Sequence, residues 1–125
     1  MRILLDTHTL LWAAKGSLSP NALALLEDTA NELYFSSASL WEIELKRKRL
    51  NLDPKAFYQG LIHSGYRELA VTSRQVLSLS QLPSLHNDPF DRILLAQALS
   101  EQVYLLTADE TLQSYSTSLD CILNY

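Results

Sequence analysis

The sequence has little of what several protein classes require. A single cysteine, Cys121, excludes an internal disulfide and cannot form a zinc site by itself; beside apolar residues it is expected to be buried filler. With 3 glycines and 4 prolines, neither disorder nor low complexity is indicated. No apolar run approaches the roughly 18 residues that span a bilayer, and the start, MRILLDTHTLLW, interrupts the apolar centre that a signal peptide needs. We therefore expect one cytoplasmic domain over residues 1–125.

Positive charge is also scarce. The formal net charge is −4, which argues against broad electrostatic attachment to nucleic acid. Four of the 10 basic residues nevertheless stand together, and we call them the basic run: Lys46, Arg47, Lys48 and Arg49. The run predicts a local basic patch on an acidic protein, or simply a solvated helix end that favours the helix dipole.

Short apolar segments alternate with segments of helical spacing along the whole chain. RILLD, ELYFSS, YRELAVT, VYLLT and the residues around CILN are typical of strands, and helices are expected between them. The expected helix caps are Ser19 before Pro20, Ser39 in SLWEIELKRKRL, and Asp53 before Pro54, and Gly65 is a plausible helix stop. This order predicts a three-layer α/β/α sandwich around a central, mainly parallel sheet of about five strands.

Four carboxylates fall just after predicted strands or in the first turns of the following helices: Asp6, Glu42, Asp91 and Asp109. Open parallel sheets bind ligands at the carboxyl ends of their strands, so these acids could converge on one edge. Each also has a structural interpretation. Glu42 could form an exposed ion pair with Lys46, and Asp109 could cap a short helix. Asp6 closes an apolar strand, where a carboxylate must be hydrogen-bonded, paired or on a metal.

The stretch HNDPFDR contains two aspartates with different expected roles. Asp88 precedes Pro89, which suits the first helical position, so Asp88 is expected to be the N-cap. Asp91 then falls in the first turn, where an acid gains from the helix dipole. It projects beside the apolar arc of Leu94 and Leu95, so its carboxylate needs a counter-charge.

Clustered carboxylates repel one another unless a cation neutralises them. Mg2+ or Mn2+ is the natural candidate, because hard divalent ions take oxygen ligands. Zinc is not indicated, since His8, His63 and His86 show no pair at zinc-ligand spacing. These histidines are expected to be structural, although His8 and His86 flank candidate acids.

The segments LLDTHTLLW, SASLWEIELKR, HNDPFDRILLAQA and LLTAD together resemble the successive motifs of PIN-domain proteins, in particular VapC-type toxins of toxin-antitoxin pairs. The resemblance extends from Met1 to about Tyr115. It implies a PIN-like fold and a Mg2+- or Mn2+-dependent ribonuclease whose metal-binding and catalytic acids are Asp6, Glu42, Asp91 and Asp109.

The resemblance also implies supporting residues and partners. Thr107 matches a hydroxyl position near the metal, Lys46 and Arg49 could contact RNA, and Arg92 could contact phosphate or pair with neighbouring acids. Proteins of this type form homodimers and are held inactive by a small antitoxin that lays a helix in an apolar groove. Leu11, Trp12 and the apolar face of ALALL could line such a groove or simply pack in the core.

Other functions compete with the nuclease. A PIN module could bind RNA or protein without cleaving, as the basic run would permit. A phosphatase with an aspartyl nucleophile wants an acid or threonine two residues after the first aspartate, where this chain has His8. A phosphoacceptor receiver domain wants a late lysine, and no lysine follows Lys55.

Overall fold

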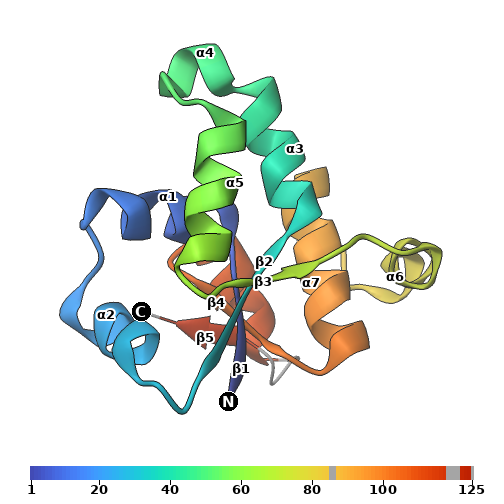
Figure 1. The fold of residues 1–125 in the computed structure, drawn as a ribbon. Helices are drawn as coiled ribbons and strands as arrows, with labels where there is room; N and C mark the ends of the chain where they lie inside the picture. The colour runs from blue at the N-terminus through green and yellow to red at the C-terminus, as the bar shows by residue number, and fades with distance from the viewer. Residues whose placement is uncertain (85–86, 118–121, 125) are drawn as a thin grey trace.

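A five-stranded parallel sheet forms the centre of the protein (Figure 1). The computed structural model describes residues 1–84, 87–117 and 122–124, so the expectations for His86 and Cys121 fall outside the described residues. The strand order is β3-β2-β1-β4-β5, and every neighbouring pair is parallel. The strands are β1 (Arg2–Leu5), β2 (Glu32–Ser36), β3 (Arg67–Leu69), β4 (Tyr104–Thr107) and β5 (Ile122–Asn124).

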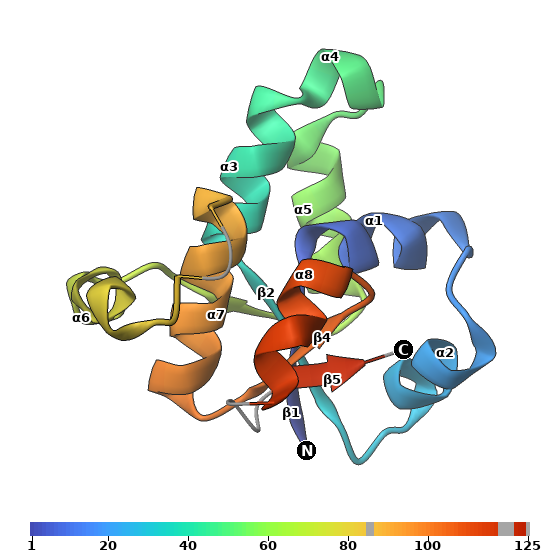
Figure 2. The ribbon, with the colours of Figure 1, turned by 180° about the vertical axis from the view of Figure 1, so that it is seen from behind.

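Helices cover both faces of this sheet, which confirms the predicted three-layer architecture (Figures 1 and 2). They are α1 (Thr7–Lys15), α2 (Pro20–Glu27), α3 (Ser37–Leu45), α4 (Arg47–Leu50), α5 (Pro54–His63), α6 (Ser73–Leu77), α7 (Pro89–Glu101) and α8 (Glu110–Gln113), with 3-10 turns η1 (Ser78–Gln81) and η2 (Ser114–Thr117). None of the helices in the described ranges is both long enough and apolar enough to cross a membrane.

The central strand β1 contributes side chains to two hydrophobic cores, one on each face of the sheet. Leu4 packs into a cluster with residues of α7, among them Leu94. Its neighbours Ile3 and Leu5 pack on the opposite face with α1 and α5. Successive side chains of a strand point to opposite faces, so an unbroken apolar strand is what a sheet covered on both sides requires.

Proline after a capping residue marks three helix starts correctly. Ser19, Asp53 and Asp88 are the N-caps of α2, α5 and α7, and each side chain accepts a backbone N–H of its first turn. The missing N–H of proline costs nothing there, because the first helical N–H groups have no partner within the helix. Gly65, with φ 91°, follows α5, which agrees with its expected role at the end of that helix.

The expected cap Ser39 is wrong. Strand β2 runs directly into α3, so Ser36 is the N-cap and its hydroxyl accepts the N–H of Ala38 at 3.0 Å. Ser39 lies inside the first turn, buried, where its Oγ accepts the hydroxyl of Thr7 at 2.9 Å.

The expected single helix over SLWEIELKRKRL is also corrected, because it divides at Lys46. There the backbone leaves helical values (φ −104°, ψ 11°), and its N–H is shared by the carbonyls of Glu42 and Ile43 at 3.1 Å each. Both views show α3 and α5 side by side, projecting beyond the sheet, with α4 at the tip (Figures 1 and 2). Most of the basic run therefore lies at the end of a helical arm.

Candidate functional site

Asp6 is fixed at the carboxyl end of the central strand. It is the N-cap of α1, and only 3% of its surface is exposed. Its Oδ1 accepts the N–H of Thr9 at 2.8 Å, and its Oδ2 accepts the hydroxyl of Thr107 at 2.5 Å. The buried carboxylate thus has hydrogen bonds on both oxygens, as its position required, and each oxygen keeps a further lone pair.

Thr107 connects Asp6 to Asp109. The register of β1 on β4 pairs Leu5 with Leu106, which places Thr107 beside Asp6. The Thr107 hydroxyl oxygen also accepts the N–H of Asp109 at 3.0 Å. This arrangement orients the backbone after β4 and brings the fourth candidate acid to the edge where the first one lies.

Asp109 caps α8 through its Oδ1, which accepts the N–H of Leu112 at 3.0 Å, so the expected capping role is confirmed. The residue also lines a cavity of about 220 Å³ at the carboxyl edge of the sheet. The residues around this cavity are Asp6, His8, Trp12, Ala108 and Asp109. Asp109 can both cap α8 and face the cavity, because the cap uses only one of its two carboxylate oxygens.

Glu42 is paired with Lys46 but is not on the surface. The Lys46 ammonium lies 2.6 Å from Glu42 Oε2, and Glu42 is 4% exposed. The expected ion pair is therefore confirmed, but the expectation that it is exposed is wrong, because Glu42 is buried. Ser39, one turn earlier on α3, contacts Thr7, the neighbour of Asp6. This contact joins the first turns of α3 and α1 near the strand ends.

Asp91 lies in the first turn of α7, as predicted. The Asp88 Oδ1 accepts the N–H groups of Phe90 and Asp91 at 2.9 and 3.3 Å, which confirms Asp88 as the cap. The ring of Phe90 meets Trp41 edge-on, with centroids 5.1 Å apart. Phe90 directly precedes Asp91, and Trp41 directly precedes Glu42. The contact between the two rings therefore packs the start of α7 against α3 beside Glu42.

The four acids are not equally close together. Asp6 and Asp109 share one cavity, whereas Glu42 and Asp91 are connected to that edge through contacts of their neighbours. Within residues 1–84, 87–117 and 122–124, no three His, Cys, Asp or Glu side chains gather closely enough to hold a metal ion.

The chemistry of the donors nevertheless fits a hard divalent cation. Every candidate ligand is an oxygen, from the four carboxylates and the Thr107 hydroxyl, and such ligands suit Mg2+ or Mn2+ rather than zinc. At Glu42 a cation, the Lys46 ammonium, already lies within contact distance of the carboxylate. The candidate oxygen ligands are thus the carboxylates of Asp6, Asp91, Glu42 and Asp109, of which only Asp6 and Asp109 line one cavity.

Arg92 has a structural role that the sequence did not suggest. Its guanidinium donates to the carbonyls of Pro83 at 3.2 Å and Leu79 at 3.0 Å. These bonds tie η1 and the residues after it to the start of α7. Arg92 thereby supports the helix that carries Asp91.

Two features near the candidate acids were not foreseen from the sequence. His8, expected to be structural although it flanks a candidate acid, lines the cavity with Asp6 and Asp109, and its ring centroid lies 6.1 Å from that of Trp12. The pair of Thr7 and Ser39 was not foreseen either. The available signal for His8 was its position two residues after the first acid, on the first turn of a helix.

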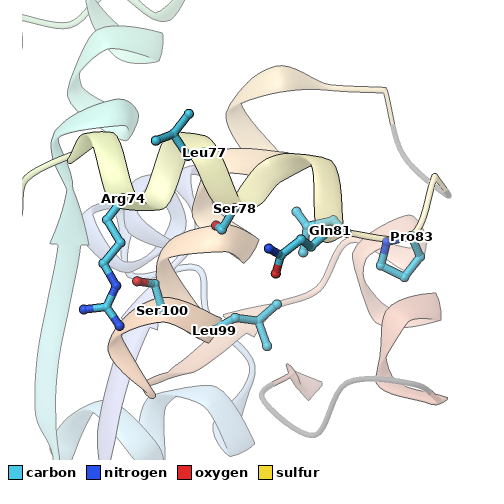
Figure 3. Close-up of a pocket in the computed structure, with 8 residues that line it drawn as sticks. Arg74, Leu77, Ser78, Gln81, Pro83, Leu99 and Ser100 are labelled. Atoms are coloured by element: carbon cyan, nitrogen blue, oxygen red, sulfur yellow. The ribbon is translucent and has the colours of Figure 1, made fainter.

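A second cavity, of about 780 Å³, lies between α6, η1 and the end of α7 (Figure 3). Arg74 extends from α6 towards Ser100 on α7, whereas Leu77 points away from α7 (Figure 3). None of the four candidate acids lines it. This cavity is separate from the acidic edge.

The PIN domain family model matches residues 3–117, and the chain belongs to the PIN domain family. Its fold is similar to a chain in the crystal structure of VapBC2 from Rickettsia felis bound to a DNA fragment from their promoter, with TM-score 0.72 and 15% identity over 99% of this chain and 98% of that one. It is also similar to a chain of VapBC-1 from nontypeable Haemophilus influenzae, with TM-score 0.70 and 16% identity over the same shares. Curated protein sequences give no match.

Proposed function

We propose that the protein is a Mg2+- or Mn2+-dependent endoribonuclease, the toxin of a VapC-type toxin-antitoxin pair. The observation that carries this proposal is the acidic edge of the sheet, where Asp6 and Asp109 share a cavity and Thr107 bonds to both residues. Membership of the PIN domain family and the likeness in fold to chains of VapBC complexes support it.

In this proposal each acid has a distinct task. Asp6 and Asp91 would hold the ion directly, and Glu42 and Asp109 would complete its surroundings through water or hold a second ion. When bound, the ion supplies an acidified, oriented water for attack on a phosphodiester and stabilises charge on the phosphate. Thr107 holds the Asp6 carboxylate in place through its 2.5 Å hydrogen bond. The cap formed by Asp88 sets the direction of the turn that carries Asp91.

RNA binding is assigned to exposed cations beyond Glu42. Arg47, Lys48 and Arg49 are exposed on α4, at the tip of the helical arm. Cations there can contact the phosphate backbone without reading sequence. This placement lets an acidic protein hold RNA locally, although its net charge of −4 repels the polyanion overall.

An antitoxin and a second copy of the chain are the proposed protein partners, in the cytoplasm. The groove residues expected from the sequence divide in the structure. Leu11 is buried, whereas Trp12 is 38% exposed at the rim of the acidic cavity. Leu23 on α2 is also exposed. An apolar helix lying on Trp12 could reach the acids, which suits an inhibitory partner.

Cleavage assays test the enzymatic proposal. We expect the purified protein to cut structured RNAs with Mg2+ or Mn2+ and to lose this activity in excess chelator. Glu42→Gln should reduce cleavage at least about tenfold, because it removes one negative charge from the ion's surroundings. Equal cleavage with and without chelator would contradict the proposal.

A non-catalytic RNA-binding PIN module is the second candidate. It is favoured by the absence, within the described ranges, of three metal-ligating side chains gathered in one place. In both cases we expect RNA affinity to depend on the basic run.

Changing Lys46, Arg47, Lys48 and Arg49 together to Ala should weaken RNA binding and reduce its salt dependence. Each lost phosphate contact lowers the slope of log affinity against log salt by about 0.7 for single strands. Fluorescence anisotropy with a labelled RNA at several salt concentrations measures both quantities. An unchanged slope would show that the basic run does not contact the RNA.

A further inference from the structure

The ion pair of Glu42 and Lys46 joins a buried acid to a more exposed cation. The side chain of Glu42 is 5% exposed and that of Lys46 is 35% exposed, and their charged atoms are 2.6 Å apart. A carboxylate with so little access to water needs a counter-charge in the folded protein. Lys46 supplies it from the residue at which α3 ends.

The two partners differ in their freedom to move. Glu42 lies within α3, between helical residues on both sides. Lys46 is the C-cap, and it connects α3 to the short exposed turn α4. A lysine side chain is a compact point charge on a flexible four-carbon stem, so Lys46 can turn to solvent while Glu42 stays where it is.

The next cation of the basic run behaves differently. Arg47 lies 3.4 Å from Glu44, and both of these side chains are more than half exposed. Such surface pairs contribute little to stability. The pair of Lys46 differs in that it engages a buried candidate site acid.

We propose that Lys46 is the internal counter-ion of Glu42, and that a divalent ion must displace its ammonium in order to use Glu42. This inference rests on the proposed function. A second cation at contact distance from Oε2 would be repelled by the ammonium already there. Lys46 therefore lowers the affinity of the site for the ion while holding the Glu42 carboxylate in place.

Calorimetric Mn2+ titrations of the full chain test the exchange, with Lys46→Gln compared with wild type. We expect Lys46→Gln to bind Mn2+ about three- to tenfold more tightly, because the competing cation is gone. The matched control is Lys48→Gln, which removes the same charge from an exposed residue of α4 and should change affinity less than about twofold. Lys46→Arg should bind no more tightly than wild type, since arginine pairs well with a carboxylate.

Several outcomes separate this inference from the proposed function. Equal Mn2+ affinities for Lys46→Gln and Lys48→Gln would overturn the exchange while leaving the metal site in place, as would weaker binding by Lys46→Gln alone. If wild type and all variants fail to bind Mn2+, the proposed function itself fails, and the exchange with it. Circular dichroism verifies folding. Should Lys46→Gln unfold, Lys46→Met replaces it in the comparison, because methionine removes the charge and keeps most of the apolar stem.

Discussion

Asp91→Asn should abolish metal-dependent RNA cleavage, by about 100-fold or more, in a protein that folds like wild type. Asparagine has nearly the same shape as aspartate, so packing at the start of α7 is retained. What is lost is the negative charge that binds the ion in the proposed site. Rates of cleavage with Mn2+, together with circular dichroism and thermal unfolding, measure the two effects separately.

The matched control is Asp88→Asn, three residues earlier on the same turn. Asp88 accepts the N–H groups of Phe90 and Asp91 as the N-cap of α7, and asparagine caps about as well as aspartate. Cleavage should therefore stay within about threefold of wild type, since the helix start is preserved. If Asp88→Asn were as inactive as Asp91→Asn, or if Asp91→Asn kept its activity, the division of roles between the two aspartates would be wrong.

Asp6→Asn is expected to have an equally large effect on cleavage. The change leaves a side-chain oxygen to accept the N–H of Thr9, so α1 remains capped. It removes the carboxylate that Thr107 orients at the cavity shared with Asp109. Cleavage should fall by about 100-fold or more, while the free energy of unfolding changes by less than about 1 kcal/mol.

Asp6→Ala distinguishes the two roles of this residue. Alanine removes both the charge and the cap, so unfolding in urea should show a loss of about 1–2 kcal/mol that Asp6→Asn does not show. Equal stability of the two variants would mean that the cap contributes nothing. Full cleavage by Asp6→Asn would show that the acidic edge is not the reaction site.

The fold could be predicted from the sequence because its signals are local. Apolar strands such as RILLD alternate with helical segments, and a capping residue followed by proline marks the starts of α2, α5 and α7. Each of these signals acts within one turn or one strand. The parallel sheet then follows from the alternation, since parallel strands need crossover helices.

The errors lie where contacts between distant residues decide the local structure. Ser39 is a good cap by composition, but β2 continues directly into α3 and the Ser39 hydroxyl contacts Thr7 instead. The bonds of Arg92 to backbone carbonyls near η1 were likewise not foreseen, and its contact with phosphate or an acid stays a prediction. Neither partner is visible in the sequence around the residue.

The positions of the candidate acids could be predicted only in part, and their role in a site stays a prediction. The placement of Asp6 and Asp109 at one edge follows from parallel strands ending together. The burial of Glu42 did not follow from its spacing to Lys46, because an i, i+4 pair forms equally well at the surface. The place of His8 in the cavity depends on how α1 leaves the sheet after its cap.

A crystal structure of the full chain with Mn2+, with the ion located by its anomalous scattering, tests the central claim most directly. The account predicts an anomalous peak bound by carboxylate oxygens of both Asp6 and Asp91, at about the 2.1 Å typical of small hard divalent ions. A peak that contacts neither aspartate, in crystals saturated with Mn2+, would contradict it.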